Sequence, residues 1–112
     1  MTLEAKLSYS KVGPDSLMLH FVVENTGNAA EKVTFRSGQR YDYILYRDGV
    51  RVEKFSEGKM FTMIYEEIAV NAGQELSFDI PLNNLKPGRH KIIVWLADAD
   101  WPTVRATLEF DV

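Results

Sequence analysis

The sequence predicts an all-β protein: a single domain over residues 1–112 with an immunoglobulin-like antiparallel β-sandwich fold. Its seven glycines recur every nine to fifteen residues, mostly beside Pro, Asn, Asp or Ser, as in turns between short strands. Between these turns apolar residues recur with a period of two, and no stretch keeps a helical period. No internal repeat or Pro-rich linker divides the chain, so about seven to nine strands would share one core.

The N-terminal part of the chain predicts two half-buried strands. Over residues 3–9, apolar side chains at odd positions alternate with charged and hydroxyl side chains. Residues 17–23 repeat the pattern, with His20 on the opposite face, and a turn follows at 25–28 (NTGN). One face of each strand would therefore line the core and the other would meet water.

Two segments, 41–46 (YDYILY) and 90–97 (HKIIVWLA), are apolar on both faces. Such strands belong in the centre of a sheet or beneath a covering loop. The turn Asp48-Gly49 follows the first of them, and this dipeptide accepts the positive φ angles of a tight hairpin. The sequence therefore predicts a hairpin at this point.

The C-terminal part of the chain predicts two further alternating strands, at 76–82 and 104–112, with a Pro-Gly turn at 86–89 between them. The inward positions of all these strands predict the core. The residues expected to contribute to it are Phe21, Phe35, Tyr43, Leu45, Phe78, Val94, Leu108 and Phe110.

Charge and cysteine content narrow the class of protein. A net charge of −3 repels phosphate, so no nucleic-acid partner is expected. The first fifteen residues hold no apolar run that could act as a signal peptide or enter a membrane, so we expect a cytoplasmic protein without a membrane partner. The absence of cysteine excludes disulfides and zinc thiolate sites and fits a reducing compartment.

The sequence offers almost nothing for catalysis or metal binding. The two histidines, His20 and His90, are expected at the surface or at a strand edge, and no Gly-x-Ser-x-Gly elbow is present. Residues 98–100 (DAD) imitate the start of a calcium loop, but Trp and Pro follow where a ligand and a glycine are needed, which predicts a solvated turn. Residues 66–67 are both Glu, yet neighbours on a strand point to opposite faces. We expect no enzyme, no metal and no cofactor.

Residues 36–63 stand out because they carry a local charge of +2, from six basic and four acidic residues, against −5 for the remainder. Within this stretch, 56–63 (SEGKMFTM) places a glycine before three large apolar residues. Either Met60 and Met63 fill the end of the sandwich, or the segment presents apolar anchors to a partner. In an extended segment Met60 would point outward and Phe61 inward; alternatively, Phe61 and Met63 begin a strand that continues to residue 68.

The runs 35–43 (FRSGQRYDY) and 56–62 (SEGKMFT), on either side of the Asp48-Gly49 turn, resemble the pattern of the BsuPI-type intracellular proteinase inhibitors. Turns at 72–75 (AGQE) and 85–88 (LKPG) occupy later turn positions of that family, so the resemblance covers most of the chain. At 53–55 this chain has Glu-Lys-Phe where the family often has Trp-Arg-Trp. The resemblance implies an inhibitor of an intracellular, subtilisin-like serine protease of bacteria.

Such an inhibitor would lay an extended loop in the protease cleft, with backbone pairing to an edge strand and one apolar side chain in the specificity pocket. Without cysteine, the loop would have to be held rigid by packing of its base on the sandwich. The residues expected to contact the protease are Lys59, Met60, Phe61, Thr62 and Met63, with Trp101, on the loop at 98–103, as a secondary contact.

A second set of residues is expected to support the fold of this region. Ser37, Gly38 and Gln39 would form a turn or bulge that aims Tyr41 and Tyr43 inward, with Gln39 capping backbone groups of a neighbouring loop. The full set of structural motif residues is Ser37, Gly38, Gln39, Tyr41, Asp42, Ser56 and Gly58. The alternative to an inhibitor is a non-inhibitory immunoglobulin-like interaction module that uses an exposed strand edge.

Overall fold

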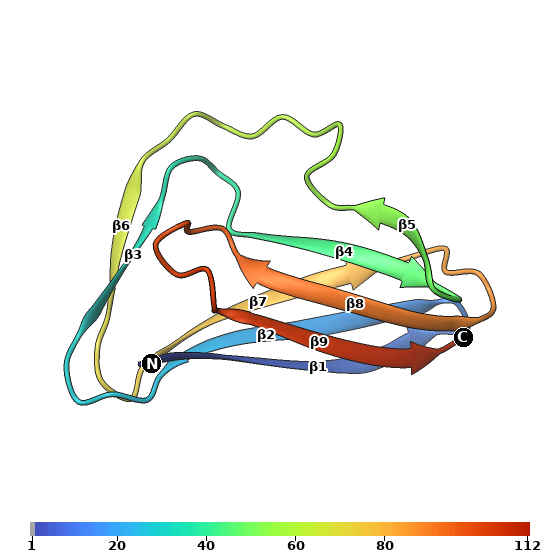
Figure 1. Ribbon diagram of the computed structural model, residues 1–112, viewed down its shortest axis with the longest axis horizontal. Coiled ribbons are helices and arrows are strands. Elements are labelled where there is room, and N and C mark those ends of the chain that lie inside the picture. The colour runs from blue at the N-terminus through green and yellow to red at the C-terminus, as the bar shows by residue number, and fades with distance from the viewer. Residues whose placement is uncertain (1) are drawn as a thin grey trace.

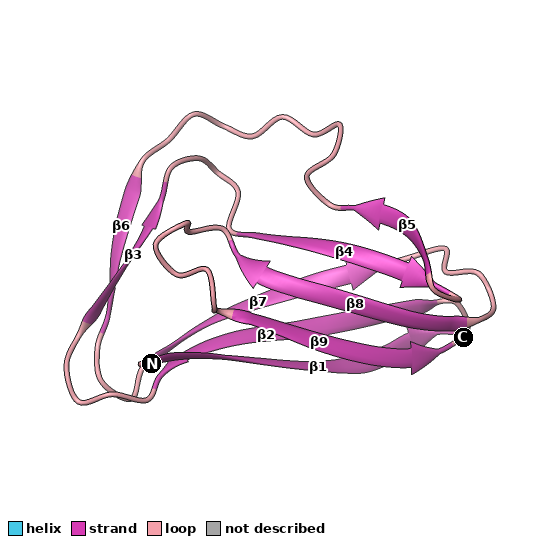
Figure 2. Ribbon diagram, in the orientation of Figure 1, coloured by secondary structure: helices cyan, strands magenta, loops and turns pink. Residues whose placement is uncertain are grey.

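The computed structural model describes residues 2–112; Met1, the first residue of the expected domain, lies outside the described part (Figure 1). The described chain contains strands and loops and no helix, which confirms the all-β prediction (Figure 2). The strands are β1 (Leu3–Gly13), β2 (Ser16–Asn25), β3 (Glu31–Phe35), β4 (Tyr41–Arg47), β5 (Val50–Lys54), β6 (Glu66–Val70), β7 (Glu75–Leu82), β8 (Arg89–Leu96) and β9 (Arg105–Asp111).

Two antiparallel sheets form the sandwich. One has the strand order β1-β2-β7, and the other has the order β5-β4-β8-β9. The strands β4 and β8 lie inside the four-stranded sheet, which explains why segments 41–46 and 90–97 are apolar on both faces. Contacts between β1 and β9 join the two sheets along one side (Figure 1). The immunoglobulin-like sandwich is therefore confirmed.

The Asp48-Gly49 hairpin is also present, between β4 and β5. Asp48 has a φ of 51° and Gly49 a φ of 83°, so both central residues adopt the left-handed conformation of a type I′ turn. The Asp48 carboxylate then accepts a hydrogen bond from the Arg89 N–H (3.0 Å). This turn thus fixes the start of β8 against the end of β4.

A third, two-stranded sheet of β3 and β6 was not expected from the sequence. It extends the β2–β7 pair beyond a bend, and the buried Asn25 holds this bend together. The Asn25 side-chain amide donates to the carbonyls of Ala29 and Val70 (both 2.8 Å), and its oxygen accepts the Gly27 N–H (2.9 Å). The sequence did not indicate this sheet because its strands are short and pair residues far apart, such as Val33 with Ile68.

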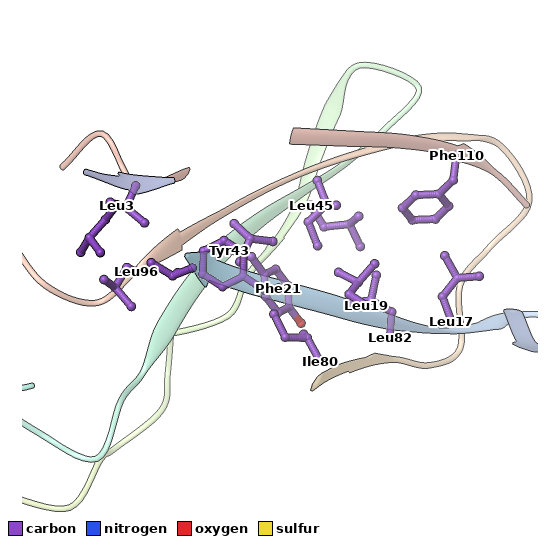
Figure 3. Close-up of a cluster of buried hydrophobic side chains, with 14 of the residues drawn as sticks. Leu3, Leu17, Leu19, Phe21, Tyr43, Leu45, Ile80, Leu82, Leu96 and Phe110 are labelled. Carbon is purple, nitrogen blue, oxygen red and sulfur yellow. The ribbon is translucent and has the colours of Figure 1, made fainter. Parts of the chain in front are cut away.

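The core lies between the two main sheets (Figure 3). Six of the eight expected core residues are buried, namely Phe21, Phe35, Tyr43, Leu45, Val94 and Phe110. The other two, Phe78 and Leu108, are only partly buried and pack against that cluster. They lie on the edge strands β7 and β9, whose neighbouring inward residues, Ile80 and Phe110, are fully covered.

Two polar residues expected at the surface are buried instead. His90 is 1% exposed because it lies on the inner strand β8, where its ring stacks on Phe110 with centroids 5.1 Å apart. Asp98 is 6% exposed, and its carboxylate accepts the N–H groups of Thr34 (2.8 Å) and Asp100 (2.9 Å). The segment 98–100 is therefore a structural turn tied to β3 rather than a solvated one.

Candidate functional site

Strand β5 and the segment between β5 and β6 carry most of the large exposed apolar side chains of the described residues. Large exposed apolar side chains of the described residues occur at eight positions, and six of these fall within 50–65: Val50, Val52, Met60, Met63, Ile64 and Tyr65. Met60 is 98% exposed and Met63 93% exposed, so both side chains stand almost entirely in water. In Figure 1 the segment runs along the upper margin of the molecule, outside both main sheets. We call residues 55–65 the contact loop.

The base of the contact loop is fixed by Asp42 on β4. The Asp42 carboxylate is buried, with 6% of the residue exposed, and accepts the Ser56 hydroxyl (2.7 Å), the Ser56 N–H (3.1 Å) and the Tyr43 N–H (2.9 Å). The Lys54 ammonium lies 4.0 Å from the same carboxylate. A buried carboxylate with several donors holds its neighbours in one arrangement. Two of the predicted motif residues, Asp42 and Ser56, therefore anchor the base of the loop to β4.

An aromatic cluster packs beneath the loop. The Phe55 ring lies 5.0 Å from the Tyr41 ring, 5.2 Å from the Tyr43 ring and 6.1 Å from the Phe61 ring, measured between centroids. The Lys59 ammonium lies 4.3 Å above the Phe55 ring, in the position of a cation–π contact. Phe61 thus points inward as support, in line with its expected orientation.

A tight turn lies between the base and the apolar tip. Gly58 has a φ of 76°, a conformation that residues with a side chain rarely adopt. Around it the Glu57 N–H donates to the Lys54 carbonyl (3.1 Å) and the Lys59 N–H to the Ser56 carbonyl (3.2 Å). Gly58 therefore supports the loop through its backbone conformation, as a structural motif residue would. This turn directs the chain outward just before Met60.

The loop that joins β3 to β4 supports the contact loop from the other side. The Gly38 N–H donates to the Thr62 carbonyl (2.8 Å), and the Arg40 guanidinium pairs with the Glu66 carboxylate (2.5 Å). The Arg36 guanidinium lies 5.8 Å from the centre of the Tyr65 ring. These contacts fix the middle and the far end of the contact loop.

The motif at 37–39 has a role in this support that differs from the expected one. The Ser37 hydroxyl accepts the Gln39 N–H (3.1 Å), which makes the predicted turn. The Gln39 amide, however, donates to the carbonyl of Tyr41 (3.0 Å) on its own chain segment rather than capping a neighbouring loop. Gly38, not Gln39, makes the contact with the neighbouring loop.

Tyr65 and Glu67 mark the point where the contact loop enters β6. The Tyr65 hydroxyl donates to the Glu67 carboxylate (2.7 Å), which also lies 3.3 Å from the Lys32 ammonium. The hydrogen bond to Glu67 raises the pKa of Tyr65, and the same bond, with help from Lys32, lowers the pKa of Glu67. At neutral pH the pair is therefore a neutral phenol and a charged carboxylate.

The tip of the contact loop leaves backbone groups available. Within the described part of the chain, the N–H groups of residues 60–63 donate to no backbone carbonyl. The loop is thus fixed through the Ser56 hydroxyl, the Phe61 ring and the Thr62 carbonyl. The N–H groups of residues 60–63 and the side chains of the two methionines stay available. The expected start of a strand at Phe61 and Met63 is not found, since β6 begins at Glu66.

Trp101 lies apart from this arrangement. Its indole N–H donates to the Lys32 carbonyl (2.9 Å) and its ring packs, partly buried, against the core. No hydrogen bond, ion pair or ring contact among residues 2–112 joins it to the contact loop. Its expected role as a secondary protease contact stays a prediction, beside a structural role in fastening the 98–103 segment to β3.

One cluster escaped the sequence analysis. On the outer face of the β1-β2-β7 sheet, the Ser10 hydroxyl lies 3.1 Å from His20 Nε2, and His20 Nδ1 lies 2.9 Å from the Asp79 carboxylate. This order matches a hydrolytic triad, but such a triad also needs converging N–H donors above the serine. Strand N–H groups point sideways, within the plane of the sheet. We therefore interpret the cluster as a surface hydrogen-bond network.

Among residues 2–112, no group of three or more His, Cys, Asp or Glu side chains could hold a metal ion. Over the same range there is no helix long and apolar enough to cross a bilayer.

Comparison with known families gives one clear match. The model of the BsuPI family, described as intracellular proteinase inhibitor, matches residues 3–101. No curated protein matches the chain.

Solved structures share the fold at low sequence identity. A β-glucosidase from Kluyveromyces marxianus is 17% identical with a TM-score of 0.55, covering 99% of this chain and 14% of that one. The CARDB domain of a Pyrococcus furiosus protein, solved with di-metal ions, is 12% identical with a TM-score of 0.53, covering 98% and 91%. A Pseudomonas fluorescens alkylpurine DNA glycosylase bound to DNA is 15% identical with a TM-score of 0.54, covering 98% and 30%. This chain thus corresponds to a small part of the two enzymes, and the likeness concerns the fold alone.

Proposed function

The chain belongs to the BsuPI family of intracellular proteinase inhibitors, and from this premise we propose that it inhibits a subtilisin-like serine protease with residues 59–63 in the active-site cleft. Met60 is the anchor that enters the specificity pocket, and Phe61 supports it from within. The setting is the cytoplasm of a bacterium. The observation that carries this proposal is the concentration of exposed apolar side chains in the contact loop, with Met60 98% exposed.

An exposed thioether suits such a pocket. Large apolar side chains that leave water at an interface supply most of its affinity, and Met60 carries no charge that would have to be desolvated. The Lys59 ammonium rests on the Phe55 ring, so the neighbouring charge is held at the base of the loop. The free N–H groups at 60–63 could donate hydrogen bonds to the backbone carbonyls of an edge strand of the protease.

The support of the loop accounts for inhibition without disulfides. Binding costs less when a loop already has its bound shape, and the contact loop is held by the Asp42–Ser56 bonds, by the Phe55–Phe61 contact and by the Gly38–Thr62 bond. Two of these contacts reach the tip itself, through the Phe61 ring and the Thr62 carbonyl, and none of them uses Met60 or Met63. The tip is thereby held in position while the two methionine side chains remain available.

The test compares Met60→Asp with Val12→Asp. Val12 is 60% exposed on β1, so both variants place one charge on an exposed apolar site. A subtilisin-like protease digests an unfolded reporter protein in the presence of each variant. We expect Met60→Asp to abolish inhibition with an unchanged Tm, and Val12→Asp to inhibit as the original chain does. Phe61→Ala is expected to lower the Tm, since the Phe55 contact is lost.

Inhibition retained by Met60→Asp would remove the contact loop from the proposal and direct attention to Trp101. A chain that binds the protease and does not slow digestion of the reporter would instead support the interaction-module alternative.

A further inference from the structure

Among residues 2–112, oxidisable sulfur is concentrated at the tip of the contact loop. The sequence has no cysteine and four methionines, of which Met1 lies outside the described residues. Met60 and Met63 are 98% and 93% exposed, whereas Met18 lies partly buried on β2, beside Pro81 of β7. Peroxide reaches exposed thioethers most readily, so of these three methionines the two in the loop are the first targets of an oxidant.

We propose that Met60 and Met63 form a modification site, where peroxide converts the thioethers to sulfoxides and thereby releases the protease. The modification itself follows from exposure alone, and the release rests on the proposed function. The chemistry is balanced for each residue. The sulfur lone pair attacks one peroxide oxygen, the O–O bond breaks, and the products are one sulfoxide and one water. Sulfur is oxidised by two electrons and the peroxide is reduced by two.

The sulfoxide opposes binding because it places a strong dipole where an apolar side chain is needed. Burying a polar group without a hydrogen-bond partner costs about 1–3 kcal/mol in proteins, which corresponds to about fivefold to 150-fold weaker inhibition. In the free chain, by contrast, oxidation of these methionines breaks no contact that holds the loop. Met60 and Met63 stand in water, and the contacts that hold the loop come from other groups, such as the Asp42 carboxylate and the Gly38 N–H.

The change is reversible in principle. A dithiol-dependent sulfoxide reductase returns the sulfoxide to the thioether, with one water formed and the dithiol oxidised to a disulfide. Because the loop tip is exposed, such an enzyme reaches it without unfolding the sandwich. Inhibition would then fall under oxidising conditions and recover under reducing ones.

The experiment treats the full chain with limiting hydrogen peroxide, which is removed before any protease is added. Peptide mass mapping follows the gain of one oxygen at each methionine. We expect residues 60 and 63 to be oxidised well before Met18, the Tm to stay unchanged, and inhibition of a subtilisin-like protease to weaken by at least about fivefold. The double variant Met60→Leu with Met63→Leu has no sulfur at the tip, so the same treatment should leave its inhibition equal to its own level before peroxide. Reductase treatment should restore the original chain.

Two outcomes would overturn the inference: oxidation of Met18 as fast as of the loop methionines, or full inhibition by the doubly oxidised chain. A different result separates the two proposals. If neither the untreated chain nor the leucine variant inhibits, the proposed function fails and protease release fails with it, while the peptide masses still decide whether Met60 and Met63 are the selective site.

Discussion

Asp42 is the residue on which the contact loop depends most. Its carboxylate is buried and accepts three hydrogen bonds, two of them from Ser56 at the base of the loop. Asp42→Asn replaces one acceptor oxygen by an N–H₂ group that faces a donor. We expect a loss of about 1–3 kcal/mol in the free energy of unfolding, measured by urea denaturation, and weaker inhibition.

Asp79→Asn is the matched control, since that carboxylate also accepts a hydrogen bond, from His20, but its side chain is 71% exposed. An exposed pair of this kind contributes about 0–1 kcal/mol. Equal losses in the two variants would show that Asp42 has no special role in holding the loop.

Tyr43 gives a prediction about alkaline pH. Its side chain is 4% exposed in the floor of a groove of about 640 Å³ between β7 and the β4–β5 pair. Burial, with the nearby Glu53 charge, raises the pKa of Tyr43 above its ordinary value. Above about pH 10 the unfolded chain therefore loses this proton while the folded chain keeps it. The free energy of unfolding must fall as pH rises through that range.

The check on Tyr43 compares urea denaturation at pH values on both sides of about 10. Tyr43→Phe removes the hydroxyl, so the variant should lose less stability on alkalisation than the original chain. An identical pH dependence in both proteins would contradict the assignment of this shift to Tyr43.

At the scale of elements, the loop between β3 and β4 acts as a brace for the contact loop through Gly38. A Cβ built at Gly38 would lie 3.5 Å from the Thr62 Cβ and backbone N, which is ordinary contact. Gly38→Ala should therefore inhibit normally. Gly38→Val adds two methyl groups against Thr62, so we expect it to displace the tip and weaken inhibition, with a smaller effect on Tm than a core truncation.

Parallel inhibition assays and thermal melts of the two Gly38 variants decide this point. The turn predicted at residues 37–39 implies a structural role for Gly38, under which Gly38→Val would destabilise the fold before it affects binding. The contact with Thr62 favours the opposite order. A large fall in Tm with normal inhibition would contradict our expectation and support the structural role.

Elements with a local signal were predictable from the sequence. Segments 41–46 and 90–97 are apolar on both faces, which predicts a position in the centre of a sheet or beneath a covering loop, and β4 and β8 are central. The β3–β6 sheet was missed because its strands are short and their pairing joins residues far apart, such as Val33 with Ile68. Period-two alternation has no information about such pairing.

The same distinction applies to the candidate site. Alternation indicated that Met60 points outward and Phe61 inward, and their exposure agrees. Alternation would also place Met63 on the side of Phe61, yet Met63 is 93% exposed, since residues 61–65 do not form a strand. The bonds that fix the loop could not be predicted, since Asp42 and Ser56 are fourteen residues apart and meet only once the β4–β5 hairpin has formed. The burial of Asp98 likewise depends on Thr34, sixty-four residues away.

At the scale of the whole molecule, stability comes from the core between the two main sheets. Phe110 is 3% exposed, and its ring stacks on His90. Phe110→Ala leaves a cavity and should cost about 3–5 kcal/mol in the free energy of unfolding. Leu108→Ala, on the same strand but only partly buried, should cost clearly less. Urea denaturation measures both values, and equal costs would contradict the assignment of Phe110 to the core.

Residues 59–63 of the contact loop are proposed to enter the protease cleft. The most direct measurement is amide hydrogen exchange of the whole chain, free and bound to a subtilisin-like protease that has been inactivated at its nucleophile. The N–H groups of residues 60–63 have no backbone partner in the free chain, so they should exchange rapidly alone and slowly in the complex. The strands β1 and β9 should be unaffected. Slower exchange on β1 or β9, with residues 60–63 unchanged, would contradict the placement of the contact loop in the protease cleft.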